Sequence, residues 1–307
     1  MSRILVIGGS GQIGLEIKNF YKNSNFIFPS SRDLDITNIN SIKNFLDINS
    51  VNLILNLAAY TDVDNAEVDK NIALNINHLG AKNIAKESSY RKIGLIHFST
   101  DYVFGKNNKG INSFNELTSP LNYYGLTKSL GEKEVLSACD TGLIIRLASV
   151  YGYYGNNFIR TIIKLLLTSS NEIKVVNDQK ISLTGSYELV KNLTYLIDLY
   201  YKKININEFN PKIIHFTNKG YTNWFNVAKI IKDEVQKLLD KKLNVKLVPI
   251  KSNNWTSLAK RPLDSRLKVD FKELEVNNIL LPRWDDSVRI FVRKILPNIK
   301  SELSNES

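Results

Sequence analysis

Short apolar runs alternate with segments of helical hydrophobic spacing along the first half of the chain. Runs of strand length lie at 4–8, 26–28, 53–57, 95–98 and 143–147. Segments with apolar positions at helical spacing lie at 11–23, 37–46, 71–87 and 124–137. Because the strand-length runs are continuously apolar, we expect both of their faces to be buried under helices. The pattern therefore predicts an α/β fold built on a doubly wound parallel sheet.

The pattern is less regular beyond about residue 150. Strand-like pieces at 173–176, 213–216 and 245–249 lie among helical segments at 158–167, 187–201 and 224–239. A last helix is expected at 285–295 and a frayed tail at 301–307. A chain of 307 residues exceeds the usual size of one core. We therefore expect a first domain at 1–150 and a smaller C-terminal α/β substrate lobe at 151–300, with some segments returning to the first domain.

The composition narrows the choice of partners. Lys and Arg number 41 against 30 Asp and Glu, but the basic residues are dispersed and Lys241–Lys242 is typical of the longest runs. This distribution favours solvated lysines, so no nucleic-acid partner is expected. Cys139 is the only cysteine, and no apolar stretch approaches the length of a membrane span. The first nine residues are also too short for a signal peptide. We expect a cytoplasmic protein without a membrane partner.

A glycine-rich turn, Gly8–Gly14, follows the first predicted strand. Gly8 permits the tight turn, Gly11 lets a pyrophosphate approach the backbone, and Gly14 lets helix and strand pack closely. The following helix presents free N–H groups and a positive dipole to the phosphates. The turn therefore predicts a dinucleotide site in a Rossmann-type fold, with a ligand-free turn as the alternative.

The end of the second strand indicates which nicotinamide dinucleotide is bound. Enzymes that use NAD usually place an acid there to hold the ribose 2′-hydroxyl, but residues 28–32 contain none. Arg32 can instead pair with a 2′-phosphate, although an exposed loop arginine is the alternative. We predict NADP(H), with NAD(H) left open. After the third strand, four residues are expected to lie against the cofactor: Ala58, Ala59, Tyr60 and Thr61.

Tyr124 and Lys128 form a Y-x-x-x-K pair at the start of a predicted helix. Residues four apart share a helix face, so the Lys128 ammonium is expected to lower the pKa of the Tyr124 phenol from about 10. Tyr124 can then protonate a ketone oxygen as hydride arrives from the nicotinamide, while Lys128 bonds the ribose hydroxyls. Thr100, at the end of a predicted strand, supplies a second hydroxyl. Such a pair occurs by chance on many helices, but its order after the glycine turn and Thr100 favours a reductase site.

The G-x-x-G-x-x-G spacing resembles that of the extended short-chain dehydrogenase/reductase superfamily. Between Ile4 and Trp284, the segments TDYVF, SPLNYYGLTKSLGE, VYGYYGNNF, VVNDQ and RPLDSRL resemble the dTDP-4-dehydrorhamnose reductase family. The resemblance implies NADP(H)-dependent reduction of dTDP-4-dehydro-L-rhamnose to dTDP-L-rhamnose, for polysaccharide synthesis. It implies catalytic Thr100, Tyr124 and Lys128, cofactor contacts at Gly11, Gln12, Ile13, Asp35, Ile36, Ala59, Tyr60 and Thr61, and substrate contacts at Thr100, Asp101, Tyr102, Asn157 and Arg261. Asp35 as a turn residue and Arg261 as a surface ion pair are the alternatives.

Departures from the family pattern concern the sugar site. Ser149 stands where the family often has tryptophan, and Ile181 and Leu183 replace a glycine and a proline. The sugar therefore stays open, with a reductase or epimerase of another nucleotide sugar as one alternative and a non-catalytic NADP-binding regulatory subunit as another. Some family members dimerise around a metal held by glutamates. Here Lys294 takes the place of one of them, so we predict no metal and leave a homodimer open.

Overall fold

Six parallel strands form the central sheet of the computed structural model, which describes residues 3–22, 25–106, 110–169, 171–205 and 212–306. The strand order is β10-β5-β4-β3-β1-β2, and every neighbouring pair is parallel. The strands are β1 (Ile4–Ile7), β2 (Phe26–Ile27), β3 (Leu53–Asn56), β4 (Gly94–Thr100), β5 (Gly142–Leu147) and β10 (Ile213–His215). The predicted α/β fold with a doubly wound parallel sheet is confirmed.

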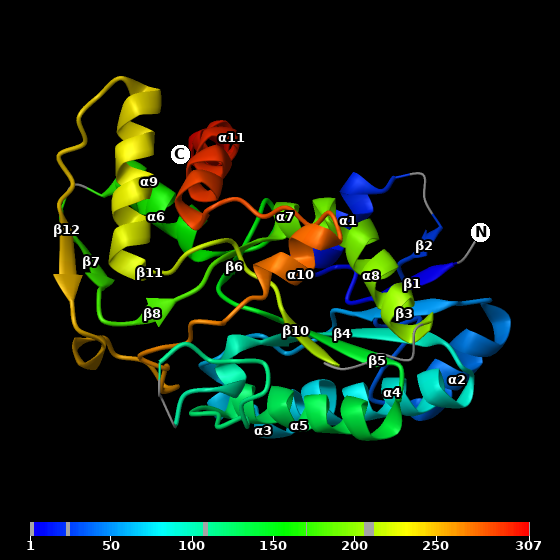
Figure 1. The fold of residues 1–307 in the computed structure, drawn as a ribbon. Helices are drawn as coiled ribbons and strands as arrows, with labels where there is room; N and C mark the ends of the chain where they lie inside the picture. The colour runs from blue at the N-terminus through cyan, green and yellow to red at the C-terminus, as the bar shows by residue number, and fades with distance from the viewer. Residues whose placement is uncertain (1–2, 23–24, 107–109, 170, 206–211, 307) are drawn as a thin grey trace.

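Helices cover both faces of this sheet (Figure 1). One face packs against α2 (Ile39–Ile48), α4 (Ala81–Tyr90) and α5 (Tyr123–Ala138). The other packs against α1 (Gln12–Phe20), α7 (Ser186–Lys191), α8 (Leu193–Asn205) and α10 (Phe271–Val276). Successive side chains of β3 point to opposite faces, so Leu53 and Leu55 enter one core and Ile54 the other. Burial on both sides explains why the strands are continuously apolar.

The C-terminal part builds a second core around three helices, α6 (Phe158–Thr168), α9 (Trp224–Leu239) and α11 (Trp284–Glu306). The parallel pair β7 (Ile173–Val176) and β12 (Leu247–Ile250) packs beside them. Two further pairs are β6 (Val150–Tyr151) with β9 (Thr184–Gly185), and β8 (Lys180–Ile181) with β11 (Thr222–Asn223). Because β10 and α8 belong to the first sheet and its core, the division near residue 150 stays a proposal.

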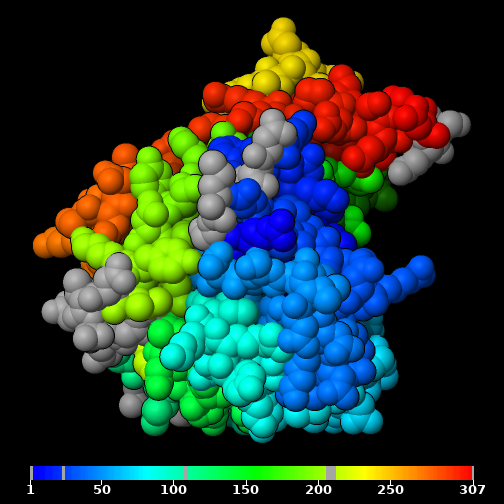
Figure 2. Space-filling view, turned by 90° about the vertical axis from the view of Figure 1, so that its right-hand side faces the viewer, coloured from blue at the N-terminus to red at the C-terminus, as the bar shows by residue number. Residues whose placement is uncertain are grey.

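The C-terminal tail differs from its prediction. Helix α11 continues through Glu306, so the frayed tail expected at 301–306 is wrong; Ser307 lies outside the described residues. Ile299 is fully buried, Leu303 packs on the second core, and Glu302 pairs with Arg160 and Lys164. These contacts to distant segments hold the last turns. In Figure 2, α11 (red) lies beneath the yellow segment at the top of the molecule and above the N-terminal segment (blue).

Several helix boundaries also differ. The segment at 71–87 comprises α3 (Lys70–Leu74), a π-helix, η2 (Asn75–Gly80), and α4. The segment at 187–201 is broken at Asn192 into α7 and α8, and α2 begins after Asn38, whose side chain caps it. The helix expected at 11–23 ends at Phe20, and Asn23 lies outside the described residues. No described helix is long and apolar enough to cross a bilayer.

Candidate active site

The glycine turn after β1 leaves no room for a side chain at Gly8 or Gly14. Gly8 has φ +86°, and a Cβ there would lie 2.7 Å from the backbone nitrogen of Ala58. A Cβ on Gly14 would lie 2.4 Å from the carbonyl oxygen of Gly8, which also accepts a hydrogen bond from the Gly11 N–H at 3.0 Å. Helix α1 starts at Gln12 with neither a side-chain cap nor an acid in its first turn. Its N–H groups therefore suit the pyrophosphate of a dinucleotide.

The residues after β2 include an exposed arginine and a turn that is held by hydrogen bonds. Arg32 is exposed, and the structure gives it no ion pair within the described residues. Asp35 accepts hydrogen bonds from the N–H and hydroxyl of Thr37, at 2.9 and 2.7 Å. Ile36 is buried against Gly80, where a Cβ would come within 2.6 Å of the Ile36 side chain. Arg32 is thus available to a 2′-phosphate, whereas Asp35 and Ile36 shape the turn.

A buried asparagine that the sequence reasoning missed holds the loop after β3. Asn77, in η2, accepts a hydrogen bond from the Tyr60 N–H (2.8 Å) and donates to the Tyr60 carbonyl (3.0 Å). It also donates to the Thr127 hydroxyl (3.0 Å), which donates in turn to the Tyr124 carbonyl (2.9 Å). Asn77 therefore links the predicted cofactor loop to the catalytic helix. The sequence offered one signal for this role, which was an amide side chain within the helix expected at 71–87.

The structure brings Thr100 and Tyr124 together at the carboxyl edge of β4. Thr100 ends the strand and is almost fully buried, and its hydroxyl acts on the Tyr124 phenol by lowering the pKa of that group. Asn122 caps α5 by accepting from the Gly125 N–H at 2.8 Å. A Cβ on Gly125 would lie 2.0 Å from the carbonyl oxygen of Tyr102. This close approach seats the start of α5 against the end of β4.

Burial sets the protonation state of the tyrosine–lysine pair. Burial raises the pKa of Tyr124 to about 12, opposed by Thr100 and assisted by nearby Asp101. Lys128 Nζ donates to the Phe98 carbonyl at 2.7 Å, and burial lowers the pKa of its ammonium to about 8. The expectation that Lys128 lowers the pKa of Tyr124 is therefore wrong for this structure, because desolvation of the phenol dominates. Tyr124 is a neutral phenol at pH 7 and can donate a proton.

The predicted substrate residues Asp101 and Tyr102 lie beside this pair. Asp101 is buried and accepts from the Thr100 hydroxyl at 3.1 Å. Burial raises the pKa of Asp101 to about 6, against the opposing effect of hydrogen bonds from Ser265 and Thr100. The Tyr102 and Tyr124 rings meet edge to face, with centroids 6.0 Å apart.

The other two predicted substrate residues have partners within the protein. Asn157 caps α6 by accepting from the Arg160 N–H at 3.2 Å, and it donates to the Gly152 carbonyl at 2.9 Å. Its loop passes the glycine turn, since a Cβ on Gly155 would lie 3.8 Å from Gln12. Arg261 forms an ion pair with Asp64 at 2.7 Å. A substrate contact at Asn157 or Arg261 stays a prediction.

The positions that depart from the family pattern have distinct environments. Ser149 takes a left-handed backbone conformation, with φ +42°, just after β5. Ile181 and Leu183 are buried in the second core, so their side chains pack inside the protein.

The remaining residues named from the sequence are Ile13, Ala59, Thr61 and Lys294. Ile13 packs on the first core, Ala59 is partly exposed and Thr61 is exposed. Lys294, which takes the place of a metal-binding glutamate of some family members, stacks over the Tyr187 ring at 4.7 Å.

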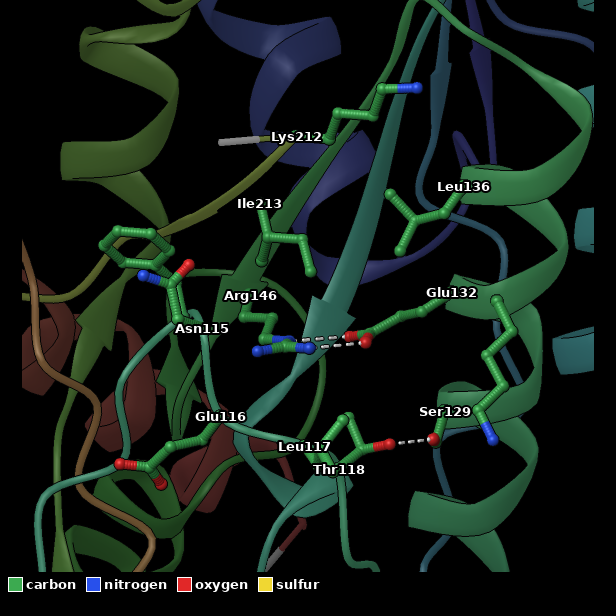
Figure 3. A pocket seen from close by; sticks show the side chains of 12 residues that line it. Asn115, Glu116, Leu117, Thr118, Ser129, Glu132, Leu136, Arg146, Lys212 and Ile213 are labelled. Atoms are coloured by element: carbon green, nitrogen blue, oxygen red, sulfur yellow. Dashed lines mark hydrogen bonds and ion pairs between the residues drawn. The ribbon is translucent and has the colours of Figure 1, made fainter. Parts of the chain in front are cut away.

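A cavity of about 680 Å³ lies farther along α5, between this helix, β5, β10 and residues 114–118 (Figure 3). Figure 3 shows Glu132 reaching from α5 to Arg146 on β5, with bonds of 2.9 and 2.7 Å. Both side chains are almost fully buried and satisfy one another. The cavity lining includes none of Thr100, Tyr124 or Lys128. We therefore regard the ion pair as an anchor of α5 and assign the cavity no part in the reaction.

The fold and this site are those of a Rossmann-type oxidoreductase that uses a nicotinamide dinucleotide. The family model described as RmlD substrate binding domain matches residues 1–296. A dTDP-4-dehydrorhamnose reductase of Aggregatibacter actinomycetemcomitans is 33% identical, over 87% of this chain and 90% of that protein. The chain belongs to the dTDP-4-dehydrorhamnose reductase family.

Solved structures of the same family agree with the fold. A dTDP-4-dehydrorhamnose reductase from Clostridium acetobutylicum is 31% identical with a TM-score of 0.84, covering 95% of this chain and 99% of that chain. The reductase from Bacillus anthracis, solved in complex with NADP, is 30% identical with a TM-score of 0.83, covering 96% of this chain and all of that chain.

Proposed function

We propose that this protein reduces the 4-keto group of a dTDP-linked sugar with NADPH, converting dTDP-4-dehydro-L-rhamnose to dTDP-L-rhamnose. The observation that carries the proposal is the neutral Tyr124 phenol, which interacts with Thr100 at the end of β4 and is followed one helical turn later by Lys128. Family membership and the names of the relatives support the sugar and the nucleotide. A cytoplasmic location and a homodimer remain part of this proposal.

The residues present fit a bound dinucleotide, which supplies a hydride to the carbonyl carbon. Gly8 and Gly14 allow the tight turn and the close packing of α1, and Gly11 would admit the pyrophosphate beside the uncapped start of this helix. Among the described residues, Lys128 Nζ makes one hydrogen bond, to the Phe98 carbonyl, which leaves two N–H donors for the ribose hydroxyls.

The protein's part in the chemistry is proton donation and orientation. Tyr124 gives its phenolic proton to the ketone oxygen, which becomes the product hydroxyl, and the resulting phenolate recovers a proton from solvent. The Thr100 hydroxyl orients the carbonyl, and its neighbour Asp101 contributes to the same polar wall. Lys128 acts on the nicotinamide side, where its ammonium holds the ribose hydroxyls.

The cofactor preference has its own test. We expect Arg32→Ala to weaken NADPH binding about tenfold or more, because a charge-assisted bond to the 2′-phosphate is lost. NADH affinity should stay within about twofold. Equal losses for both nucleotides would contradict the role of Arg32.

The reaction is tested by following NADPH consumption with dTDP-4-dehydrorhamnose, generated by the upstream epimerase. The proposal predicts turnover to dTDP-rhamnose, and slower turnover with 4-keto sugars on other nucleotides. NADPH binding without turnover of any 4-keto nucleotide sugar would contradict reduction and favour the regulatory-subunit alternative. Turnover of another sugar only would correct the substrate.

A further inference from the structure

An ion pair joins two loops that the sequence places almost two hundred residues apart. Asp64 follows β3, and both of its oxygens contact Arg261, at 3.2 and 2.7 Å. The same carboxylate accepts from the Ala259 N–H at 2.9 Å. Asp64 therefore fixes both the guanidinium and the backbone of the loop that carries it.

Most of the N–H donors of Arg261 have partners in the protein. Among the described residues it donates to both oxygens of Asp64 and to the Ala259 carbonyl (3.3 Å). A guanidinium has five N–H donors, so two remain for a ligand. Asp64 thus sets the orientation of the remaining N–H donors of Arg261 and the position of its positive charge.

The segment that carries Asp64 also contacts the cofactor side and the catalytic helix. At one end, Tyr60 is held by Asn77 through both of its backbone polar groups. At the other end, the Glu67 carboxylate accepts from the Tyr123 N–H, at the start of α5, at 2.8 Å. Residues 60–67 therefore form one connection from the predicted cofactor loop to the helix of Tyr124, with Asp64 branching to Arg261.

We propose that Asp64 is a positioning residue that couples the dinucleotide site to Arg261 and that Arg261, in turn, holds the diphosphate of the nucleotide-sugar substrate. When NADP(H) lies against residues 58–61, the motion of residues 60–67 is restricted. Because Asp64 belongs to this segment, its ion pair also restricts the position of Arg261. Arg261 then contacts the diphosphate with its free N–H groups and its positive charge. The proposal rests on the proposed function. Because coupling between two sites is reciprocal, it can be measured from either ligand.

The test uses the whole protein and two probes, NADP⁺ and dTDP, by titration calorimetry. The wild type should bind dTDP at least about fivefold more tightly with saturating NADP⁺ than without it. Asp64→Asn keeps the shape and one acceptor but loses the ion pair, and should bring this ratio below about two. Asp140→Asn is the matched control: it removes the same charge at an exposed position outside residues 60–67, where the Asp140 carboxylate lies 3.7 Å from the Lys212 ammonium. Its ratio should equal that of the wild type.

Arg261→Lys provides a second route that leaves Asp64 in place. It should also reduce the ratio, and the double variant with Asp64→Asn should be no worse than either single variant, because both remove one connection. If the Asp64→Asn protein binds each probe more weakly but keeps the wild-type ratio of dTDP affinities with and without NADP⁺, Asp64 supports the structure without coupling the two sites. This result would overturn the proposal. Failure of the wild type to bind dTDP would instead contradict the proposed function, and the coupling with it.

Discussion

Lys128 is a functional group that the fold holds at a cost to stability. Its side chain is 2% exposed, and burial lowers its pKa from 10.5 to about 8, with Glu132 opposing. A pKa that is lower in the folded than in the unfolded state means that the protonated lysine disfavours folding. Replacing Lys128 with methionine should therefore stabilise the protein while it removes the ammonium that the reaction needs.

The magnitude follows from the gap between the two pKa values. Between 10.5 and about 8, at about 1.4 kcal/mol per pH unit, the cost is about 3 kcal/mol. Loss of the bond from Lys128 to the Phe98 carbonyl offsets about 1 kcal/mol. Lys128→Met should thus gain about 2 kcal/mol at pH 7. The cost is full below pH 8, where both states are protonated, and it is relieved as pH rises towards 10.5 because the folded protein loses its proton first.

Urea unfolding at pH 7 and pH 10, followed by tryptophan fluorescence, measures this free energy. The advantage of Lys128→Met should shrink at the higher pH. Lys133→Met is the control, because Lys133 is exposed on the same helix and its replacement should change stability by less than about 0.5 kcal/mol. A Lys128→Met protein that is no more stable than the wild type at pH 7, or whose advantage is independent of pH, would refute the reasoning.

Three further substitutions probe the site. Tyr124→Phe should lower kcat by at least about a hundredfold and leave the NADPH affinity within about twofold, whereas Tyr123→Phe should retain activity. Comparable rates for the two variants would contradict the assignment of Tyr124 as the proton donor. Burial raises the pKa of Asp101 to about 6, so the pH profile of kcat/KM should change slope near pH 6. Asp101→Asn should remove this change of slope, and a profile that keeps it would assign it to another group. Asn77→Ala leaves partly buried backbone groups of Tyr60 unpaired and should cost about 2 kcal/mol in the free energy of urea unfolding. A change below about 0.5 kcal/mol would show that these hydrogen bonds are unimportant for stability.

Hydrophobic patterning was sufficient for the central sheet, because continuously apolar runs such as 53–57 are typical of strands covered on both faces. It was insufficient where tertiary contacts decide the local structure. The π-helix at Asn75–Gly80 and the last turns of α11 depend on partners far away in the sequence, among them the packing of Leu303. Pairs of two-residue strands, such as β6 with β9, carry too few residues for a periodic signal.

Motif order predicted which residues meet at the site, but not their electrostatics. Thr100 and Tyr124 end a strand and begin a helix, so the topology alone brings them to one edge of the sheet. The pKa of Tyr124 depends instead on burial under the assembled fold. The links through Asn77 and Asp64 span 50 and 197 residues, and no local pattern indicates them.

Hydride transfer to the sugar tests the central claim most directly. The purified protein would be given NADPH deuterated at the transferable position together with dTDP-4-dehydrorhamnose, and the product analysed by mass spectrometry and NMR. We predict one deuterium at C4 of dTDP-rhamnose, and a greatly reduced yield with Tyr124→Phe under the same conditions. Recovery of an unlabelled sugar, or of label at another carbon, would contradict the assignment of this site as a 4-keto reductase.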